Sequence, residues 1–99
     1  AMEFNKLYEA SYGAGSRNAF AAYSYDGYLR LEQAVPVALK KARPGTAEFR
    51  QALRDAQENS KEVVGTHAVY NTKPGDHNGV DRRARVLVEV VNGEWKLVK

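Results

Sequence analysis

The sequence contains no cysteine, only three prolines and no long apolar run. Without cysteine the chain can form no disulfide, no thiolate nucleophile and no cysteine-ligated zinc site. No run of apolar residues approaches the roughly 18–20 that a membrane-spanning helix needs. At 99 residues the chain is long enough for one domain at most, and it is close to the smallest size that builds a core alone.

A strong charge imbalance is also missing. Fifteen basic residues stand against 12 acidic ones, for a net charge of +3. The basic residues gather at positions 40–43 and 82–85, and neither cluster is interleaved with the aromatic side chains that stack on bases. We therefore interpret both clusters as solvated helix ends and a strand entry, and we expect no nucleic-acid partner.

Recognisable catalytic and metal-binding motifs are absent as well. The two histidines, His67 and His77, accompany no nucleophile motif and no acidic pair of familiar spacing. Residues 76–81 faintly resemble a calcium loop, but they lack the alternating ligands and the closing glutamate of an EF-hand. Turn chemistry explains these residues better. We expect no catalytic residue, no metal and no cofactor.

Helical periodicity dominates the first half of the chain. Apolar residues recur at steps of three and four over residues 18–39, which predicts a long helix covered on more than one side. Ser16 or Asn18 can cap it, and Pro36 predicts a kink or break near Glu32. A shorter helix is expected over residues 3–12. A third follows Thr46, a plausible N-cap, and fades after residue 56.

Alternating patterns dominate the second half. They predict one strand over residues 64–71, broken by Gly65, and a longer one over residues 84–91. The pair Asn92-Gly93 is typical of a tight type I′ hairpin turn, and it would place Val90 opposite Trp95 on a buried face. Because an isolated hairpin is marginal in water, we expect it to join the 64–71 strand or to pack on the helices. The chain is thus predicted to be α+β, with three helical segments followed by an antiparallel sheet with a C-terminal hairpin.

The order and spacing of these segments carry a resemblance. It rests on Tyr25-Asp26-Gly27 leading into a helix that ends at residues 38–42, on residues 49–56, on Val64-Gly65 before a strand, on residues 76–79 and on the closing residues 91–98. Taken together, these features resemble the C-terminal part of type I periplasmic solute-binding proteins. Within that family the chain is similar to the branched-chain amino acid and aromatic-acid receptors of ABC importers.

The resemblance implies that residues 1–99 are a single fragment of a larger protein with a two-lobe α/β fold. Residues 1–2 would then derive from an expression vector. The intact protein would be a periplasmic receptor and not an enzyme. It would bind a small amino acid or an aromatic carboxylate between its lobes and would then dock on a membrane permease. The ligand would bind only to the full-length protein.

Two residues are expected at the ligand. The resemblance places Phe20 where the family supplies an apolar wall to the cleft, and Tyr23, one turn later, could share that face by proximity. Tyr25-Asp26 is interpreted as a packing signature of the helix rather than a ligand contact. As an isolated fragment the chain is expected to form a homodimer, because its apolar hairpin row and long helix both need cover.

A second interpretation remains open. A self-contained α+β small-molecule enzyme or sensor of the nuclear transport factor 2 kind would also place helices first and strands last. Against this alternative, the sequence predicts only three clear strands and no acid–base pair aimed at a cavity.

Overall fold

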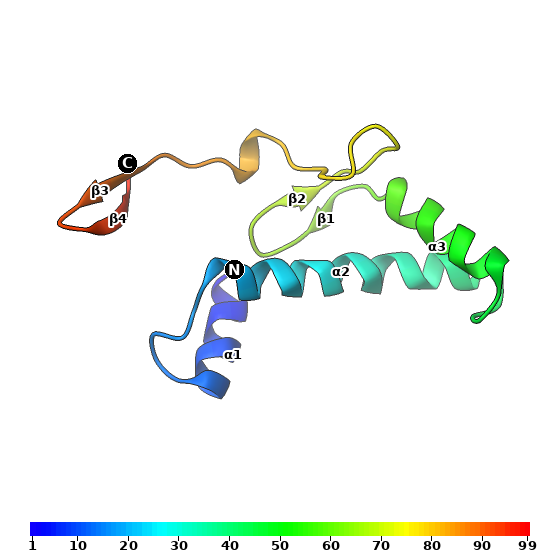
Figure 1. The fold of residues 1–99 in the computed structure, drawn as a ribbon, viewed down its shortest axis with the longest axis horizontal. Coiled ribbons are helices and arrows are strands. Elements are labelled where there is room, and N and C mark those ends of the chain that lie inside the picture. Colours follow the sequence, from blue (N-terminus) through cyan, green and yellow to red (C-terminus); the bar gives the residue numbers. More distant parts are fainter.

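A computed structural model describes all residues from 1 to 99, and Figure 1 shows its arrangement. The elements in chain order are α1 (Met2–Tyr12), α2 (Ala19–Leu39), α3 (Ala47–Glu58), β1 (Val63–Val64), β2 (Val69–Tyr70), the 3₁₀ helix η1 (Arg82–Ala84), β3 (Val88–Val91) and β4 (Glu94–Leu97). The predicted α+β class, with three helices before antiparallel strands, is confirmed.

Helix α2 is the element against which α3 and the β1–β2 hairpin lie, whereas β3 and β4 stand apart from it (Figure 1). It begins at Asn18, whose Oδ1 accepts a hydrogen bond from the Ala21 amide at 2.9 Å, so this predicted cap is confirmed. Of the two outcomes predicted near Pro36, a kink or a break, the break is wrong, because the helix continues to Leu39. Pro36 lies in the last turn, and the Glu32 residue whose carbonyl it leaves unbonded is exposed, so water can satisfy that carbonyl.

Helix α3 packs against the second half of α2. Thr46 caps it as predicted, with its hydroxyl oxygen accepting from the Phe49 amide at 3.1 Å. The residues buried where these helices lie are small: Ala34 and Ala38 in α2, and Ala52 in α3. Small side chains allow two helix backbones to approach closely, so this part of the chain is held by short-range packing rather than by large apolar groups.

The strand predicted over residues 64–71 is wrong. The chain reverses within it, and the Gly65 amide donates to the Ala68 carbonyl at 2.8 Å. Strands β1 and β2 pair antiparallel in a short hairpin, with Val63 opposite Tyr70. Alternation along the sequence could not reveal this turn, because the residues on both sides of it keep the period of two.

The C-terminal hairpin has the predicted register, with Val90 opposite Trp95 and a turn at Asn92 and Gly93, both at positive φ. Its surroundings differ from the prediction. Strands β3 and β4 form a sheet of their own, separate from β1 and β2, and the Trp95 side of the hairpin is exposed rather than buried. The long strand predicted from residue 84 begins only at Val88, because η1 occupies its start.

The chain as a whole is open. Its radius of gyration is 16.8 Å, whereas a compact chain of this length has a radius of about 13 Å. Only 11 of the 99 residues are buried, and large apolar side chains such as Leu87 and Trp95 are about three-quarters exposed. Such a shape encloses no core of its own beyond the contacts around α2.

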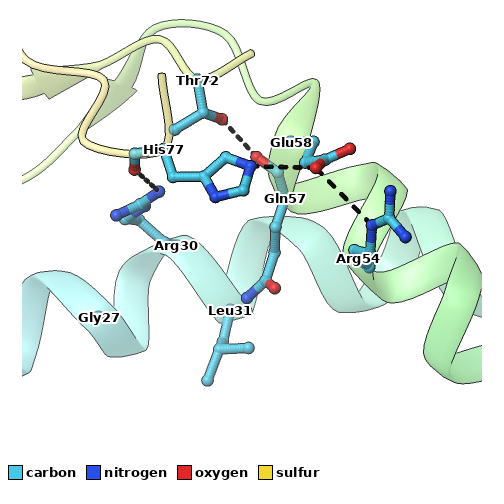
Figure 2. Close-up of a pocket in the computed structure, with 8 residues that line it drawn as sticks. All are labelled: Gly27, Arg30, Leu31, Arg54, Gln57, Glu58, Thr72 and His77. Carbon is cyan, nitrogen blue, oxygen red and sulfur yellow. Dashed lines mark hydrogen bonds and ion pairs between the residues drawn. The ribbon is translucent and has the colours of Figure 1, made fainter. Parts of the chain in front are cut away.

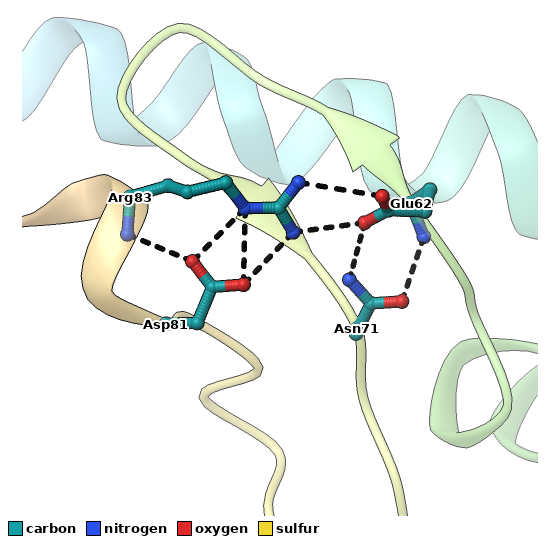
Figure 3. Close-up of polar contacts among 4 residues, drawn as sticks. All are labelled: Glu62, Asn71, Asp81 and Arg83. Carbon is teal, nitrogen blue, oxygen red and sulfur yellow. Dashed lines mark hydrogen bonds and ion pairs between the residues drawn. The ribbon is translucent and has the colours of Figure 1, made fainter.

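A polar network ties η1 to the β1–β2 hairpin (Figure 3). The Arg83 guanidinium donates to the Asp81 carboxylate, at 2.8 Å for the shortest contact, and to the Glu62 carboxylate, at 3.0 Å. Asn71 accepts from the Glu62 amide and donates to the Glu62 carboxylate. These groups are largely exposed, so each pair contributes little to stability, and the network mainly fixes the direction in which the chain leaves β2.

The turn between β1 and β2 approaches α2 very closely at Gly65. A methyl group placed on Gly65 would lie 2.6 Å from Asp26 Oδ2 and 2.7 Å from Tyr70 Cε2. Both neighbouring residues are buried, so neither can move aside without breaking contacts. Only glycine therefore fits between the turn and the helix.

We expect Gly65→Ala to lower the free energy of unfolding by about 1–3 kcal/mol, because overpacking forces the turn away from α2. The matched control is Gly75→Ala, since an added methyl there meets nothing within 4 Å. Urea unfolding of both variants measures the difference. Equal stabilities would show that the turn can retreat from α2 without cost.

Candidate functional site

The two residues expected at the ligand lie together at the start of α2. The side chain of Phe20 is 80% exposed and that of Tyr23 is 54% exposed. Their ring centroids are 6.4 Å apart and the rings are nearly perpendicular, in the edge-to-face arrangement that aromatic pairs prefer. Two neighbouring aromatic rings of a rigid helix therefore face outward without a covering group from the chain.

A third ring joins them from the β1–β2 turn. The imidazole of His67 lies 4.5 Å from the Tyr23 ring, centroid to centroid. We name Phe20, Tyr23 and His67 the aromatic face. The sequence pattern missed His67 as a member, because His67 was assigned to the strand that was predicted to resume after Gly65. Only the reversal between Gly65 and Ala68 brings its ring onto α2.

A buried carboxylate holds the turn in place. Asp26, one helical turn after Ala22, is only 2% exposed. Its Oδ1 accepts hydrogen bonds from the Thr66 amide at 2.6 Å and from the Thr66 hydroxyl at 2.7 Å. Its Oδ2 accepts from the Tyr70 hydroxyl at 2.7 Å and from the His67 amide at 3.3 Å. One side chain thus satisfies donors from the turn and from β2, and these hydrogen bonds supply the partners that a buried carboxylate requires.

These hydrogen bonds decide the charge of Asp26. Burial by itself opposes ionisation, but the donors from Thr66, Tyr70 and His67 favour the carboxylate and together hold the pKa of Asp26 below its ordinary value. The partner is shifted in the opposite direction: burial, followed by the bond to Asp26, raises the pKa of the Tyr70 hydroxyl to about 12. At neutral pH the pair is a carboxylate accepting from a neutral phenol.

The interpretation of Asp26 as a packing residue agrees with this geometry. The sequence contained a signal that could have located its partner surface, since the small residue Ala22 lies one helical turn before Asp26 on the same side of α2 and both are buried. The stripe of large side chains, including Leu31 and Leu39, was expected to be covered and is instead exposed.

The loop at residues 76–81 has the turn chemistry expected of it. Asp76 Oδ1 accepts from the amides of Asn78 and Gly79, each at 3.1 Å, and Gly79 has a positive φ of 70°. No group of three or more histidine, aspartate or glutamate side chains is placed to hold a metal ion.

Solved structures of known proteins resemble the chain closely. An extracellular ligand-binding receptor from Rhodopseudomonas palustris is 49% identical to it with a TM-score of 0.89, over 99% of this chain and 27% of the receptor. A receptor of the same description from strain HaA2 is 44% identical with a TM-score of 0.90, over 99% of this chain and 28% of the receptor. A further HaA2 receptor is 38% identical with a TM-score of 0.77, over 94% and 26%.

Over nearly its whole length the chain is similar to extracellular ligand-binding receptors, which are periplasmic binding proteins. It spans a little over a quarter of the length of the receptors it matches, which is consistent with a segment from the C-terminal part of such a protein. Those receptors have two lobes, and the chain corresponds to a portion of that fold. No protein-family model and no curated protein matches the chain.

The open shape of the chain is consistent with a segment of such a receptor. A segment of a two-lobe protein exposes, when taken alone, the surfaces that the rest of the protein covers. None of its helices combines the length and apolar character needed to cross a membrane.

The buried carboxylate generates a test. Asp26→Ala leaves the donors of Thr66, His67 and Tyr70 without their acceptor, so we expect the free energy of unfolding to fall by about 3 kcal/mol at pH 7. Asp55→Ala is the matched control. It removes only an exposed contact with Gln51 and should cost less than about 0.5 kcal/mol.

The pH dependence of this difference has a definite sign. Because folding lowers the pKa of Asp26, its contribution is complete above the unfolded value of about 3.9 and is lost as the pH falls through the lower folded value. Urea unfolding between pH 7 and pH 2 should therefore show the wild type and Asp26→Ala converging in acid. A gap that stays constant would mean that Asp26 acts through packing and not through its charge.

Proposed function

We propose that the chain is the part of an ABC-importer receptor that supplies one wall of the cleft in which a small amino acid or an aromatic carboxylate binds. The observation that carries this proposal is the aromatic face. Phe20, Tyr23 and His67 present adjoining rings to the outside at the start of α2. The solved structures that the chain resembles are described as extracellular ligand-binding receptors.

Preorganisation supports this role. A binding wall is effective when its side chains need no reordering as the ligand arrives. The backbone under Phe20 and Tyr23 is a capped helix, and the backbone under His67 is fixed to that helix by Asp26. Aromatic rings on such a support can stack on the flat or branched apolar part of a ligand at little entropic cost.

The ligand's carboxylate and the receptor's partners follow from the same proposal. The groups that bind the carboxylate would lie in the parts of the receptor outside residues 1–99. We place the receptor in the periplasm, where it would deliver its ligand to a membrane permease. It would act as a binding protein and not as an enzyme, and it would need no cofactor.

The alternative of a self-contained enzyme or sensor is not favoured. A cone-shaped fold of the nuclear transport factor 2 kind would need a continuous curved sheet around a cavity. The structure has two separate two-stranded sheets and an open shape instead. The receptors at 44–49% identity have nearly the same fold over this segment, and matching them requires no continuous curved sheet.

In the intact receptor, Phe20→Ala should weaken ligand binding roughly five- to tenfold, because the loss of an aromatic contact costs about 1 kcal/mol or slightly more. It should change stability little, since the side chain is 80% exposed within this segment. Calorimetric titration with leucine, phenylalanine and benzoate measures the affinity. Thermal unfolding of the same samples measures the stability.

Phe49→Ala is the matched control for this test. Phe49 lies half-buried on α3, away from the aromatic face, so its truncation should cost about 2 kcal/mol of stability and leave affinity unchanged. If Phe20→Ala instead loses stability while its affinity stays the same, Phe20 packs against the rest of the receptor and the cleft lies elsewhere.

We further propose that residues 1–99, taken alone, pair as a homodimer. The hairpin side chains Val88, Val90, Trp95 and Leu97 are all about half or more exposed and form a continuous apolar row beside unpaired strand edges. Such rows and edges promote pairing between identical chains. Sedimentation equilibrium should give about twice the 11.0 kDa of one chain. The variant Trp95→Lys should shift the equilibrium toward monomer, whereas a monomeric wild type would contradict the proposal.

A further inference from the structure

A hollow lies between α2, α3 and the loop that follows β2 (Figure 2). Its volume is about 480 Å³, which is within the usual range for small-molecule sites. Three elements supply its lining, which consists of Gly27, Arg30, Leu31, Arg54, Gln57, Glu58, Thr72 and His77. None of these residues belongs to the aromatic face, and Arg30 follows Phe20 by ten residues along α2, or about 15 Å at the rise of a helix, although Gly27 lies only one turn after Tyr23.

The cation on one wall of the hollow is held but not neutralised. The Arg30 guanidinium lies over the Tyr70 ring, 5.0 Å from its centroid, and donates one hydrogen bond to the His77 carbonyl at 3.3 Å. It takes part in none of the ion pairs of the chain. A guanidinium has five N–H donors in a rigid fork, so most of its donors remain available.

The opposite wall already has its charges paired. Glu58 Oε1 lies 3.0 Å from His77 Nε2 and 3.7 Å from Arg54 Nε, as Figure 2 shows. Only Arg30 therefore lacks a counter-charge. Any repulsion that remains from Glu58 is stronger for a dianion such as phosphate than for a monoanion, and a carboxylate has the planar shape that matches the fork of Arg30.

The remaining lining suits an apolar body. Gly27 leaves open space on α2, because a methyl group there would meet nothing within 4 Å, and Leu31 lies one turn further on. The side chain of Gln57 extends from α3 toward Leu31 and makes no hydrogen bond within the chain (Figure 2).

We propose that this hollow binds a small monocarboxylate. The carboxylate lies on Arg30, the hydrocarbon part lies over Gly27 and Leu31, and the Gln57 amide is free to hydrogen-bond a polar substituent. The Tyr70 ring and the His77 carbonyl fix the guanidinium before the ligand arrives, which lowers the entropic cost of binding.

This inference rests on the proposed function in one respect, because the test needs the intact receptor of which residues 1–99 are proposed to be a part. The receptor is labelled with ¹⁵N-arginine, and the side-chain Nε–H signal of Arg30 is assigned by its loss in Arg30→Gln. Sodium butyrate is the probe, and sodium phosphate and sodium chloride at equal ionic strength are the comparisons. Arg50, which is exposed on α3 and does not line the hollow, is the matched control through Arg50→Gln.

We expect the Arg30 signal to shift saturably with butyrate and not with phosphate or chloride, while the Arg50 signal stays still. Calorimetry at the same site should show a loss of roughly tenfold or more in butyrate affinity for Arg30→Gln and none for Arg50→Gln, as befits a charge-assisted hydrogen bond. Equal shifts with phosphate would make the hollow a general anion site and overturn the proposal. No shift would overturn it as well.

Phe20→Ala separates this proposal from the previous one. If butyrate acts at the hollow, the Arg30 shift persists in Phe20→Ala whatever that variant does to binding at the aromatic face. If the shift disappears with Phe20, butyrate binds at the aromatic face and the hollow is not a carboxylate site. If Phe20→Ala leaves ligand affinity unchanged while the Arg30 shift persists, only the proposal that the aromatic face is a wall of the ligand cleft is contradicted.

Discussion

The buried carboxylate of Asp26 is the interaction on which the arrangement of this chain depends. It joins α2 to the β1–β2 turn through the Thr66 amide and hydroxyl and to β2 through the Tyr70 hydroxyl. The two candidate sites depend on it in different ways. On one side it sets His67 against Tyr23 and completes the aromatic face, and on the other it positions the Tyr70 ring beneath Arg30. A charge buried in this way is costly unless every donor is in place, so it selects one geometry for the turn.

The second constraint is the shortage of buried apolar surface. With 11 of 99 residues buried, the chain gains little from the hydrophobic effect around α2, and its C-terminal hairpin gains almost nothing. A two-stranded hairpin without a covering layer is marginal. The receptors that the chain matches are more than three times its length, so a larger fold of that kind can cover the surfaces left open here, such as that of Trp95.

Local features were predictable from the sequence because they depend on neighbours along the chain. The caps at Asn18 and Thr46 and the turn at Asn92-Gly93 are of this kind. The receptor family was identified from the order of such features. The predictions that failed depend on what lies opposite a side chain. Periodicity correctly marked Trp95 as one side of a hairpin, but it could not show that nothing covers that side. Likewise, His67 reaches the aromatic face only through a reversal that alternation concealed.

The central claim is that residues 1–99 are one piece of a two-lobe receptor whose remainder covers the open hairpin. Amide hydrogen exchange of β3 and β4 tests it most directly, measured in residues 1–99 at a concentration where they are monomeric and again in the intact receptor. The account predicts that these amides exchange rapidly in the isolated chain and become protected by at least about a hundredfold in the receptor, since covering the hairpin should add about 3 kcal/mol to its local stability. Equal protection in both would show that the hairpin needs no partner, and would contradict the account.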